Sequence, residues 1–147
     1  MARIVIALGG NALGNTPEEQ LEKVANAAKS IVEFVKQGHD VIIGHGNGPQ
    51  VGMINNAMDF SSKNGGKTPA MPFPECGAMS QGYIGYHLQN AILREETKQG
   101  INKNVVTVDF YDWLQKKIPS VQNFQFIYDP TESYSVSSDF TIVLAEQ

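Results

Sequence analysis

Apolar and polar residues in the first part of the chain follow two patterns, one typical of strands and one typical of a helix. Uninterrupted apolar runs at residues 3–8 and 40–43 predict buried parallel strands. Between them, Thr16-Pro17-Glu18-Glu19 is typical of a helix start, with threonine as N-cap and Glu19 at the capping-box position. Gly38 is placed to end that helix. Its predicted apolar face consists of Leu21, Val24, Ala25, Ala28, Ile31, Val32 and Val35.

The next segments predict two more helices and a third strand. A helix is expected from Gly48 to about Phe60, followed by a loop over residues 61–74 that is rich in glycine and proline. A second helix is expected from Gly77 to about Gln99, and a strand over residues 104–108. The glycines inside that helix, which are Gly77, Gly82 and Gly85, are expected to permit close packing. The order β-α-β-α-α-β, with a right-handed crossover in its first unit, predicts a layered α/β/α domain.

The composition of the chain changes near residue 108. Residues 1–108 carry nine acidic and nine basic side chains, whereas residues 109–147 carry six acidic and two basic ones. All 14 glycines precede the change, and eight of the 13 aromatic residues follow it. We therefore expect an N-terminal lobe over residues 1–108 and a divergent acidic, aromatic-rich tail over residues 109–147. Within the tail, Asp109 is expected to cap a short helix that extends to about Lys117, and residues 124–128 and 140–144 are expected to form strands.

Bulk properties exclude several classes of protein for this sequence of 147 residues. Its hydrophobic content of 41% and charged content of 18% are typical of a globular domain. The net charge of −4, without any cluster of lysine or arginine, argues against a nucleic-acid partner. No apolar run approaches the roughly 20 residues that span a bilayer, so no membrane partner is expected. The single cysteine, Cys76, excludes an internal disulfide, and we expect a cytoplasmic location.

Two glycine-rich turns carry the candidate chemistry, because each follows one of the first two predicted strands. The first is Gly9-Gly10-Asn11, and the second is Gly44-His45-Gly46-Asn47-Gly48-Pro49-Gln50. Glycines allow backbone N–H groups to approach an oxyanion, and the N-terminus of a following helix adds partial positive charge. A tight turn without a ligand explains the first segment equally well, but the second has more glycines than a turn requires. Two such turns predict two phosphate-like groups held close together, as in a phosphotransferase.

Side chains near the turns are compatible with this chemistry, and other nucleotide motifs are not met. Asn11, Asn47 and Gln50 offer amide donors suited to a planar anion. The dinucleotide pattern G-x-G-x-x-G fails because Pro49 or Val51 stands at its third glycine.

Other candidate residues near these motifs stay open or have an ordinary structural explanation. Gly66-Lys67-Thr68 matches only the end of a Walker A motif and follows no strand, so Lys67 is expected to be a solvated loop residue. His45 could act as an acid or base, or be purely structural. His39 and His87 lack metal-like spacing with it, and Cys76 is expected to be a small buried or half-buried thiol.

Three segments together resemble carbamate kinases, of the amino acid kinase family. They are Ile4–Leu13, Gly44–Gly52 and Cys76–Tyr86, and the resemblance covers about residues 2–107. It implies an α/β fold, a three-layer α/β/α sandwich around a mainly parallel sheet, which is the amino acid kinase fold in truncated form. Because members of the family are roughly twice this length, we expect the chain to lack the half that binds the nucleotide.

The resemblance implies the reaction ATP + carbamate ⇌ ADP + carbamoyl phosphate, with Mg²⁺, which serves arginine breakdown in the direction that makes ATP. By resemblance, Gly9, Gly10 and Asn11 would be catalytic residues that contact the transferred phosphoryl group. Gly46, Asn47 and Gly48 would hold the carbamate end, with Gln50 as a further substrate-binding residue. The ATP/ADP site is expected in the missing half, and no metal ligand is assigned. A homodimer is expected, with residues 77–99 as the candidate interface.

Other functions remain compatible with these residues. One is a non-catalytic protein that keeps an anion pocket, and another is a subunit that dimerises with a full-length kinase. A third is a different amino acid kinase, acting on glutamate or acetylglutamate, but residues 44–50 and 76–86 argue against it.

Overall fold

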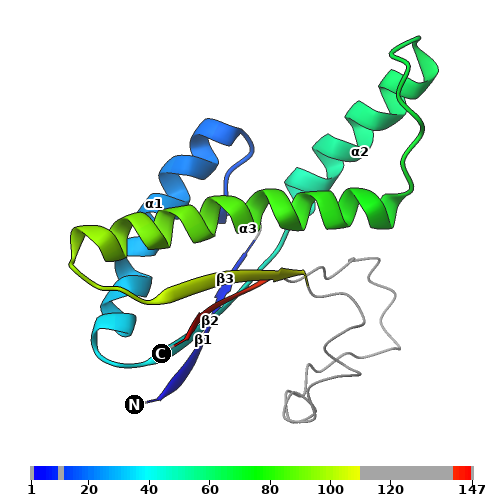
Figure 1. The fold of residues 1–147 in the computed structure, drawn as a ribbon. Helices are drawn as coiled ribbons and strands as arrows, with labels where there is room; N and C mark the ends of the chain where they lie inside the picture. Colours follow the sequence, from blue (N-terminus) through cyan, green and yellow to red (C-terminus); the bar gives the residue numbers. More distant parts are fainter. Residues whose placement is uncertain (1, 10–11, 110–140, 147) are drawn as a thin grey trace, which may run out of the picture.

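The computed structural model describes residues 2–9, 12–109 and 141–146, and it describes side chains as far as residue 107. Three helices and four strands follow one another along these residues (Figure 1). They are β1 (Arg3–Leu8), α1 (Pro17–Lys36), β2 (Asp40–His45), α2 (Gly48–Lys63), α3 (Phe73–Lys98), β3 (Asn104–Asp109) and β4 (Thr141–Glu146).

The four strands form one sheet in the order β1-β2-β4-β3. β1 and β2 are parallel, which confirms the predicted β-α-β unit, while β4 runs antiparallel to both β2 and β3. Three of the strands therefore point in the same direction, and β4 is reversed. The strand expected at residues 140–144 is found at Thr141–Glu146, and its place between β2 and β3 is not predictable from its sequence.

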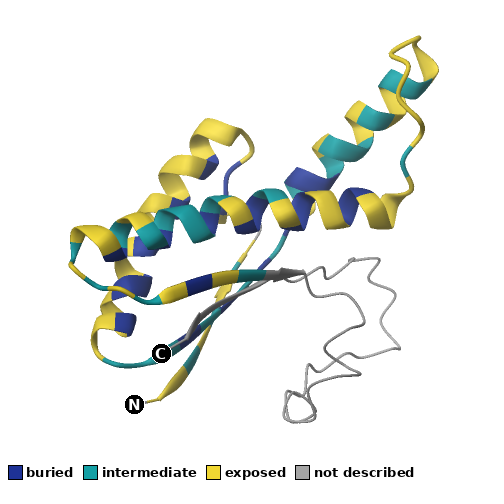
Figure 2. Ribbon diagram, viewed as in Figure 1, coloured by how far each residue is buried: buried dark blue, intermediate teal, exposed yellow. Residues whose placement is uncertain are grey.

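Helices α1 and α3 lie side by side on one face of the sheet (Figure 1). Alternate strand residues point toward them, so that β2 shows a strictly alternating pattern of buried and half-buried positions. Figure 2 shows the buried positions concentrated where the helices meet each other and the sheet. A single apolar cluster joins these elements; it includes Val24, Ile31, Ile43, Ile84, Leu88 and Val105. The α/β class is confirmed, and of the expected three layers the described residues show the sheet and one helical layer.

The start of α1 agrees with its predicted capping signals. The Thr16 hydroxyl accepts a hydrogen bond from the Glu19 N–H at 3.2 Å, and Pro17 occupies the first turn. The Glu19 carboxylate accepts from the Asn15 N–H at 2.9 Å, one residue before the position that a capping box requires. Gly38 follows the helix with a positive φ of 81°, as expected of a glycine just past a helix end.

Two predicted helix boundaries were wrong. α2 continues to Lys63, and α3 begins at Phe73 rather than Gly77, so the loop between them is shorter than residues 61–74. The prolines were interpreted as loop residues, but Pro74 lies in the first helical turn, where its missing N–H costs nothing.

The predicted apolar face of α1 also requires a correction. Leu21 is 48% exposed and Ala25 is exposed, whereas Gln20 is buried in their place. On α3, Gly77 and Gly85 are buried as expected, but Gly82 is exposed and its missing Cβ would meet no atom within 4 Å. Gly82 therefore permits no close approach, in contrast to the prediction.

Some predictions for the tail lie beyond what the structure describes. Asp109 is the last residue of strand β3, and its expected role as a helix cap stays a prediction. The expected helix beyond it and the expected strand at residues 124–128 lie outside the described residues, and the proposed boundary at residue 108 stays a prediction. Among the helices that the structure describes, none has the length and apolar character needed to cross a bilayer.

Glu96 is an unusual member of the buried stripe of α3. Its side chain is only 2% exposed, and neither carboxylate oxygen has a hydrogen-bond partner among the described residues. Burial raises the pKa of Glu96, and the charge of Lys103 opposes that shift. A carboxylate whose pKa is raised by folding destabilises the folded state as the pH rises above the unfolded value.

We therefore expect Glu96→Gln to stabilise the protein at pH 7, by on the order of 1 kcal/mol in the free energy of unfolding. The stability difference between the variant and the unmodified protein should shrink toward pH 4, where the carboxyl group is mostly protonated in both the folded and the unfolded state. Urea denaturation between pH 4 and pH 8 measures it. The exposed Glu22→Gln is the matched control and should show no such pH dependence. If the free energy of unfolding of both variants depends on pH in the same way, the raised pKa of Glu96 is not the cause.

Candidate anion-binding site

The two glycine-rich turns lie next to each other because the strands that precede them are paired in parallel. Leu8 and His45, the last residues of β1 and β2, are register partners. Beyond them, the Gly46 N–H donates to the Leu8 carbonyl oxygen at 2.9 Å. The carboxyl ends of parallel strands are the usual position of ligand sites in α/β proteins. The described starts of the two turns are therefore adjacent, while the expected pair of phosphate-like groups stays a prediction.

The first turn is closed by its own backbone. The Ala12 N–H donates to the Gly9 carbonyl oxygen at 2.8 Å, and the chain then turns at Gly14, whose φ is +81°. A Cβ at Gly14 would lie 2.8 Å from the Glu19 Cβ, so this position requires glycine for both its conformation and its contacts. Gly10 and Asn11 lie outside the described residues, and of this motif only Gly9 can be placed.

The second turn leads directly into α2, whose first residue is Gly48. Asn47 is the N-cap, and its side chain makes no capping hydrogen bond. No side chain caps this first turn, but Pro49 has no N–H and the Val51 N–H donates to the Asn47 carbonyl oxygen at 2.9 Å. The backbone donors that the turn can offer are therefore the N–H groups of Gly48 and Gln50. A Cβ at Gly9 or at Gly48 would meet no atom of the described residues within 4 Å, so among these residues there is open space beside both glycines. Backbone donors beside open space are a suitable arrangement for an oxyanion.

The Asn47 side chain is fixed from the side of α3. It is 3% exposed, and its amide nitrogen donates to the Ser80 hydroxyl oxygen at 2.8 Å. The Ser80 hydroxyl in turn donates to the Gly77 carbonyl oxygen at 2.7 Å. The third sequence segment, which was expected mainly to pack α3, therefore also positions the second turn. Ser80 was missed as a site residue, although a polar residue in the buried stripe of α3 was a usable signal.

The Gln50 side chain points toward α1. It links that helix to Gly14, which follows the first turn. Its amide nitrogen donates to the Gly14 carbonyl oxygen at 2.9 Å and to Gln20 Oε1 at 3.1 Å. Gln20 is itself hydrogen-bonded to His87 Nδ1 at 3.0 Å. Both described hydrogen bonds of the Gln50 amide nitrogen are thus to protein atoms, while its Oε1 has no partner among the described residues. Gln20 was not among the sequence candidates, and it explains why a polar residue interrupts the apolar face of α1.

His45 lies beneath the second turn and is 1% exposed. Its Nδ1 is 3.2 Å from the Gly46 carbonyl oxygen, and since a carbonyl only accepts, Nδ1 carries the proton. Burial lowers the pKa of His45, although the bond to Gly46 raises it in part. The ring is therefore neutral near pH 7, which favours a structural or acceptor role over that of a cation.

The described residues provide little charge at this site. Neither Gly9–Leu13 nor Gly44–Gln50 contains a lysine or arginine. No group of three or more His, Cys, Asp or Glu side chains in the described ranges could hold a metal ion. The arrangement can therefore bind an anion through backbone N–H groups, and it brings Gly9, Gly46, Asn47 and Gly48 together.

Comparison with known proteins agrees with this geometry. The model of the amino acid kinase family matches residues 2–145. A carbamate kinase of Staphylococcus haemolyticus is 57% identical over 108 residues, which are 74% of this chain and 35% of that protein. Carbamate kinase 3 of Staphylococcus aureus is 49% identical over the same shares. The chain therefore covers about a third of the length of these relatives.

Solved structures give the same result. Carbamate kinase from Giardia lamblia bound to AMP-PNP has a TM-score of 0.64 and 35% identity, over 74% of this chain and 40% of that one. The same enzyme thiocarbamoylated by disulfiram has a TM-score of 0.66 and 28% identity, over 96% of this chain and 52% of that one. The chain belongs to the amino acid kinase family, and its N-terminal part is similar to part of the sequence of carbamate kinases.

Proposed function

We propose that this chain carries the carbamoyl-phosphate side of a carbamate kinase, the enzyme that catalyses ATP + carbamate ⇌ ADP + carbamoyl phosphate. In this proposal Gly9, Gly10 and Asn11 contact the phosphoryl group, and Gly46, Asn47 and Gly48 hold the carbamoyl end. The observation that carries it is the pairing of the two turns, with open space beside Gly9 and Gly48. Identities of 49–57% to curated carbamate kinases support the choice of substrate. Gln50, which is tied to Gly14 and Gln20, is proposed to shape the pocket from behind.

We propose ATP and ADP as the nucleotides. In this proposal the nucleotide is bound mainly by protein groups other than the residues that the structure describes. A Giardia relative was solved with AMP-PNP, an ATP analogue, which supports this choice. The described residues do not fit a Mg²⁺ site, since they contain no suitable group of ligands. No role in catalysis is therefore assigned to Mg²⁺ on these residues. A cytoplasmic location and a part in arginine breakdown stay predictions.

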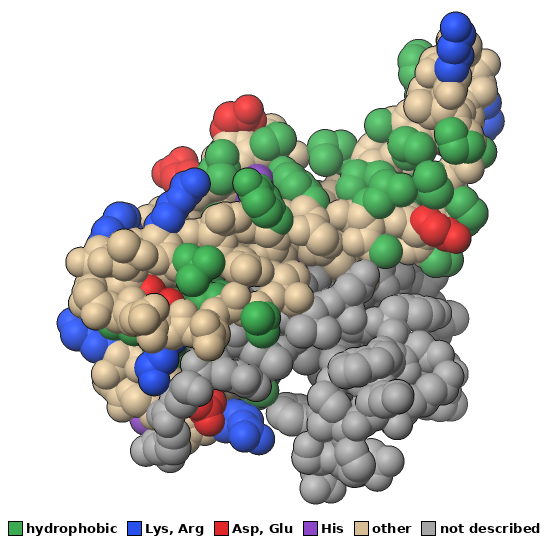
Figure 3. Space-filling view, in the orientation of Figure 1, with side chains coloured by type: hydrophobic (Ala, Val, Ile, Leu, Met, Phe, Trp, Pro, Cys, Tyr) green, Lys and Arg blue, Asp and Glu red, His purple; other side chains and the backbone are tan. Residues whose placement is uncertain are grey.

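A second proposal is that the chain forms a homodimer through the outer side of α3. Large apolar side chains are exposed there and on the neighbouring α2; they include Met53, Phe73, Met79 and Tyr86. Figure 3 shows hydrophobic side chains gathered over this part of the surface. Exposed apolar patches of this kind are typical of protein interfaces. Such a chain could act as a non-catalytic, anion-binding or dimerising protein, which is the alternative function.

The anion site can be tested by filling its open space. Gly48→Ala should abolish the binding of carbamoyl phosphate, because the new methyl group occupies the space beside the helix N-terminus. The fold should tolerate it, since no atom lies within 4 Å of the added Cβ and alanine favours a helix. Isothermal titration calorimetry with carbamoyl phosphate, and with inorganic phosphate as the simpler anion, measures the loss.

Gly52→Ala is the matched control for Gly48→Ala. Gly52 is one turn further along α2, and its Cβ would also meet nothing within 4 Å. It should raise the free energy of unfolding by up to about 1 kcal/mol and leave anion binding unchanged. If Gly48→Ala binds carbamoyl phosphate as well as the unmodified chain, or if both variants lose the same affinity, the anion does not bind at the N-terminus of α2.

A further inference from the structure

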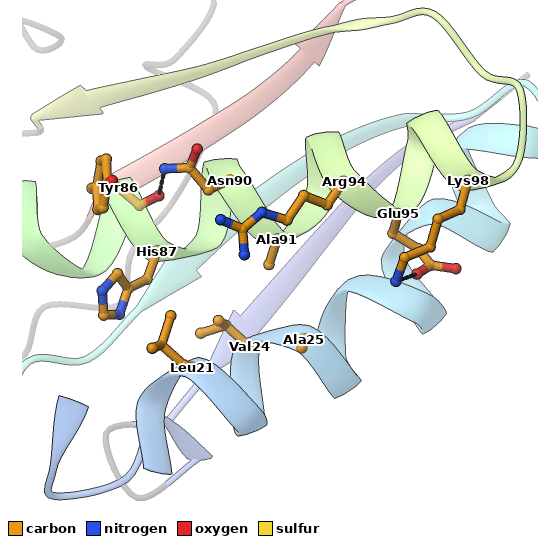
Figure 4. Close-up of a pocket in the computed structure, with 10 residues that line it drawn as sticks. All are labelled: Leu21, Val24, Ala25, Tyr86, His87, Asn90, Ala91, Arg94, Glu95 and Lys98. Atoms are coloured by element: carbon orange, nitrogen blue, oxygen red, sulfur yellow. Dashed lines mark hydrogen bonds and ion pairs between the residues drawn. The ribbon is translucent and has the colours of Figure 1, made fainter. Parts of the chain in front are cut away.

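A groove runs between α1 and α3 on the side of these helices that faces away from the sheet. Its volume is about 370 Å³, within the range of small-molecule sites. Leu21, Val24 and Ala25 line it from α1, and Ala91 lines it from α3 (Figure 4). These residues give the groove an apolar wall. It is separate from the two glycine-rich turns, and one of its lining residues, Tyr86, also belongs to the surface proposed for the homodimer.

Arg94 supplies a cation to the groove. Figure 4 shows its guanidinium group lying over the groove, beside Ala91, because α3 side chains lean toward the helix N-terminus. Among the described residues, no acidic side chain forms an ion pair with Arg94. The neighbouring cation, Lys98, is paired, since its Nζ is 3.2 Å from Glu95 Oε2. Arg94 is therefore free to bind an anion, and guanidinium groups bind carboxylates in a bidentate manner.

His87 supplies a second donor two helical turns before Arg94. Its Nδ1 is 3.0 Å from Gln20 Nε2, an amide nitrogen that can only donate, so Nδ1 is the acceptor. The ring proton of the neutral imidazole is then on Nε2. Figure 4 shows the His87 ring on the side of the groove where Leu21 lies. Arg94 and His87 thus both line the groove, one as a cation and the other with a neutral N–H donor.

We propose that the α1–α3 groove is a binding site for a small amphipathic carboxylate. The carboxylate would lie against the Arg94 guanidinium with the His87 N–H as a further donor, and the hydrocarbon part would cover Leu21 and Ala25. Such a ligand matches both the Arg94 cation and the apolar wall of the groove, because it carries one negative charge on a short hydrocarbon chain. Acetate lacks the body, and an alcohol of equal length lacks the charge, so both should bind poorly.

The test uses hexanoate as the probe and the full chain as the protein. We expect hexanoate to cause saturable shifts of the Leu21 and Val24 methyl signals in NMR spectra, with a dissociation constant in the millimolar range. Acetate and 1-hexanol should each bind at least about tenfold more weakly. Arg94→Gln should weaken hexanoate binding about tenfold. Arg3→Gln removes the same charged group from an exposed position on β1 and should change nothing.

A second pair of variants tests the apolar wall. Ala25→Leu fills the groove from an exposed helical position and should prevent binding, while Ala57→Leu makes the same change on exposed α2 and should not. The proposal is overturned if Arg94→Gln binds hexanoate as well as the unmodified chain, if hexanol binds equally well, or if no shift saturates. It is also overturned if hexanoate no longer shifts the Leu21 and Val24 signals at protein concentrations where the chain is a dimer, since a second copy of the chain would then occupy the groove.

Discussion

Leu88→Ala is expected to remove a large part of the stability of the fold. Leu88 is fully buried at the centre of α3, between Ile84 and Ile92, in the cluster that joins both helices to the sheet. Truncating a buried leucine typically costs about 2–5 kcal/mol, as lost transfer free energy plus a cavity. Domains of this size are stable by only about 5–15 kcal/mol in total. We therefore expect a marked fall in the urea midpoint, measured by circular dichroism at 222 nm.

Leu21→Ala is the control for this prediction, since it makes the same chemical change on a surface helix position. Leu21 is 48% exposed, so its truncation should cost less than about 1 kcal/mol. Similar losses for the two variants would mean that α3 does not pack as described. The comparison also tests the corrected face of α1, because the sequence pattern had placed Leu21 in the core.

The elements of the first part of the chain could be predicted because their signals are local. Thr16 and Gly38 mark the ends of α1, and both signals are present in the structure. The start of α3 was missed because prolines suit both loops and first helical turns, and the sequence does not distinguish these positions. The place of β4 depends on pairing with β2 and β3, which are far away along the chain. Strand order of this kind is a non-local property that local patterns do not determine.

The candidate site was likewise predictable from the sequence only where its signals are local. The two glycine-rich turns could be found, since parallel strands bring their carboxyl ends to one edge of the sheet. The side chains that fix the turns were not assigned, because Ser80 and Gln20 come from other helices and the partners they contact are not given by their own local pattern. Their contacts follow from how α1 and α3 pack. Glycines in the sequence indicate the backbone conformation of their own turn. A hydrogen bond from another helix that supports the turn can be assigned only from the tertiary structure.

The last prediction concerns turnover by the 147-residue chain itself. We expect the purified chain to form no detectable ATP from carbamoyl phosphate and ADP in a coupled assay, even where it binds carbamoyl phosphate. Phosphoryl transfer depends on positioning and on stabilising the charge of the transferring group. Loss of a single donor to such a charge commonly reduces the rate about 10²–10³-fold. The two turns contain no lysine or arginine, so neither of them supplies a side-chain cation to the transferring group.

The controls for this assay separate binding from catalysis. The carbamate kinase of Staphylococcus haemolyticus, which is 57% identical over the shared part, is the positive control for the coupling enzymes. Turnover by the short chain that disappears in Gly48→Ala but persists in Gly52→Ala would contradict the prediction, and it would mean that this chain provides the missing charge. Binding without turnover would instead mean that the glycine-rich turns hold the substrate, while the acceleration comes from cations elsewhere. The two halves of catalysis, positioning and charge, would then be separable along the sequence of this family.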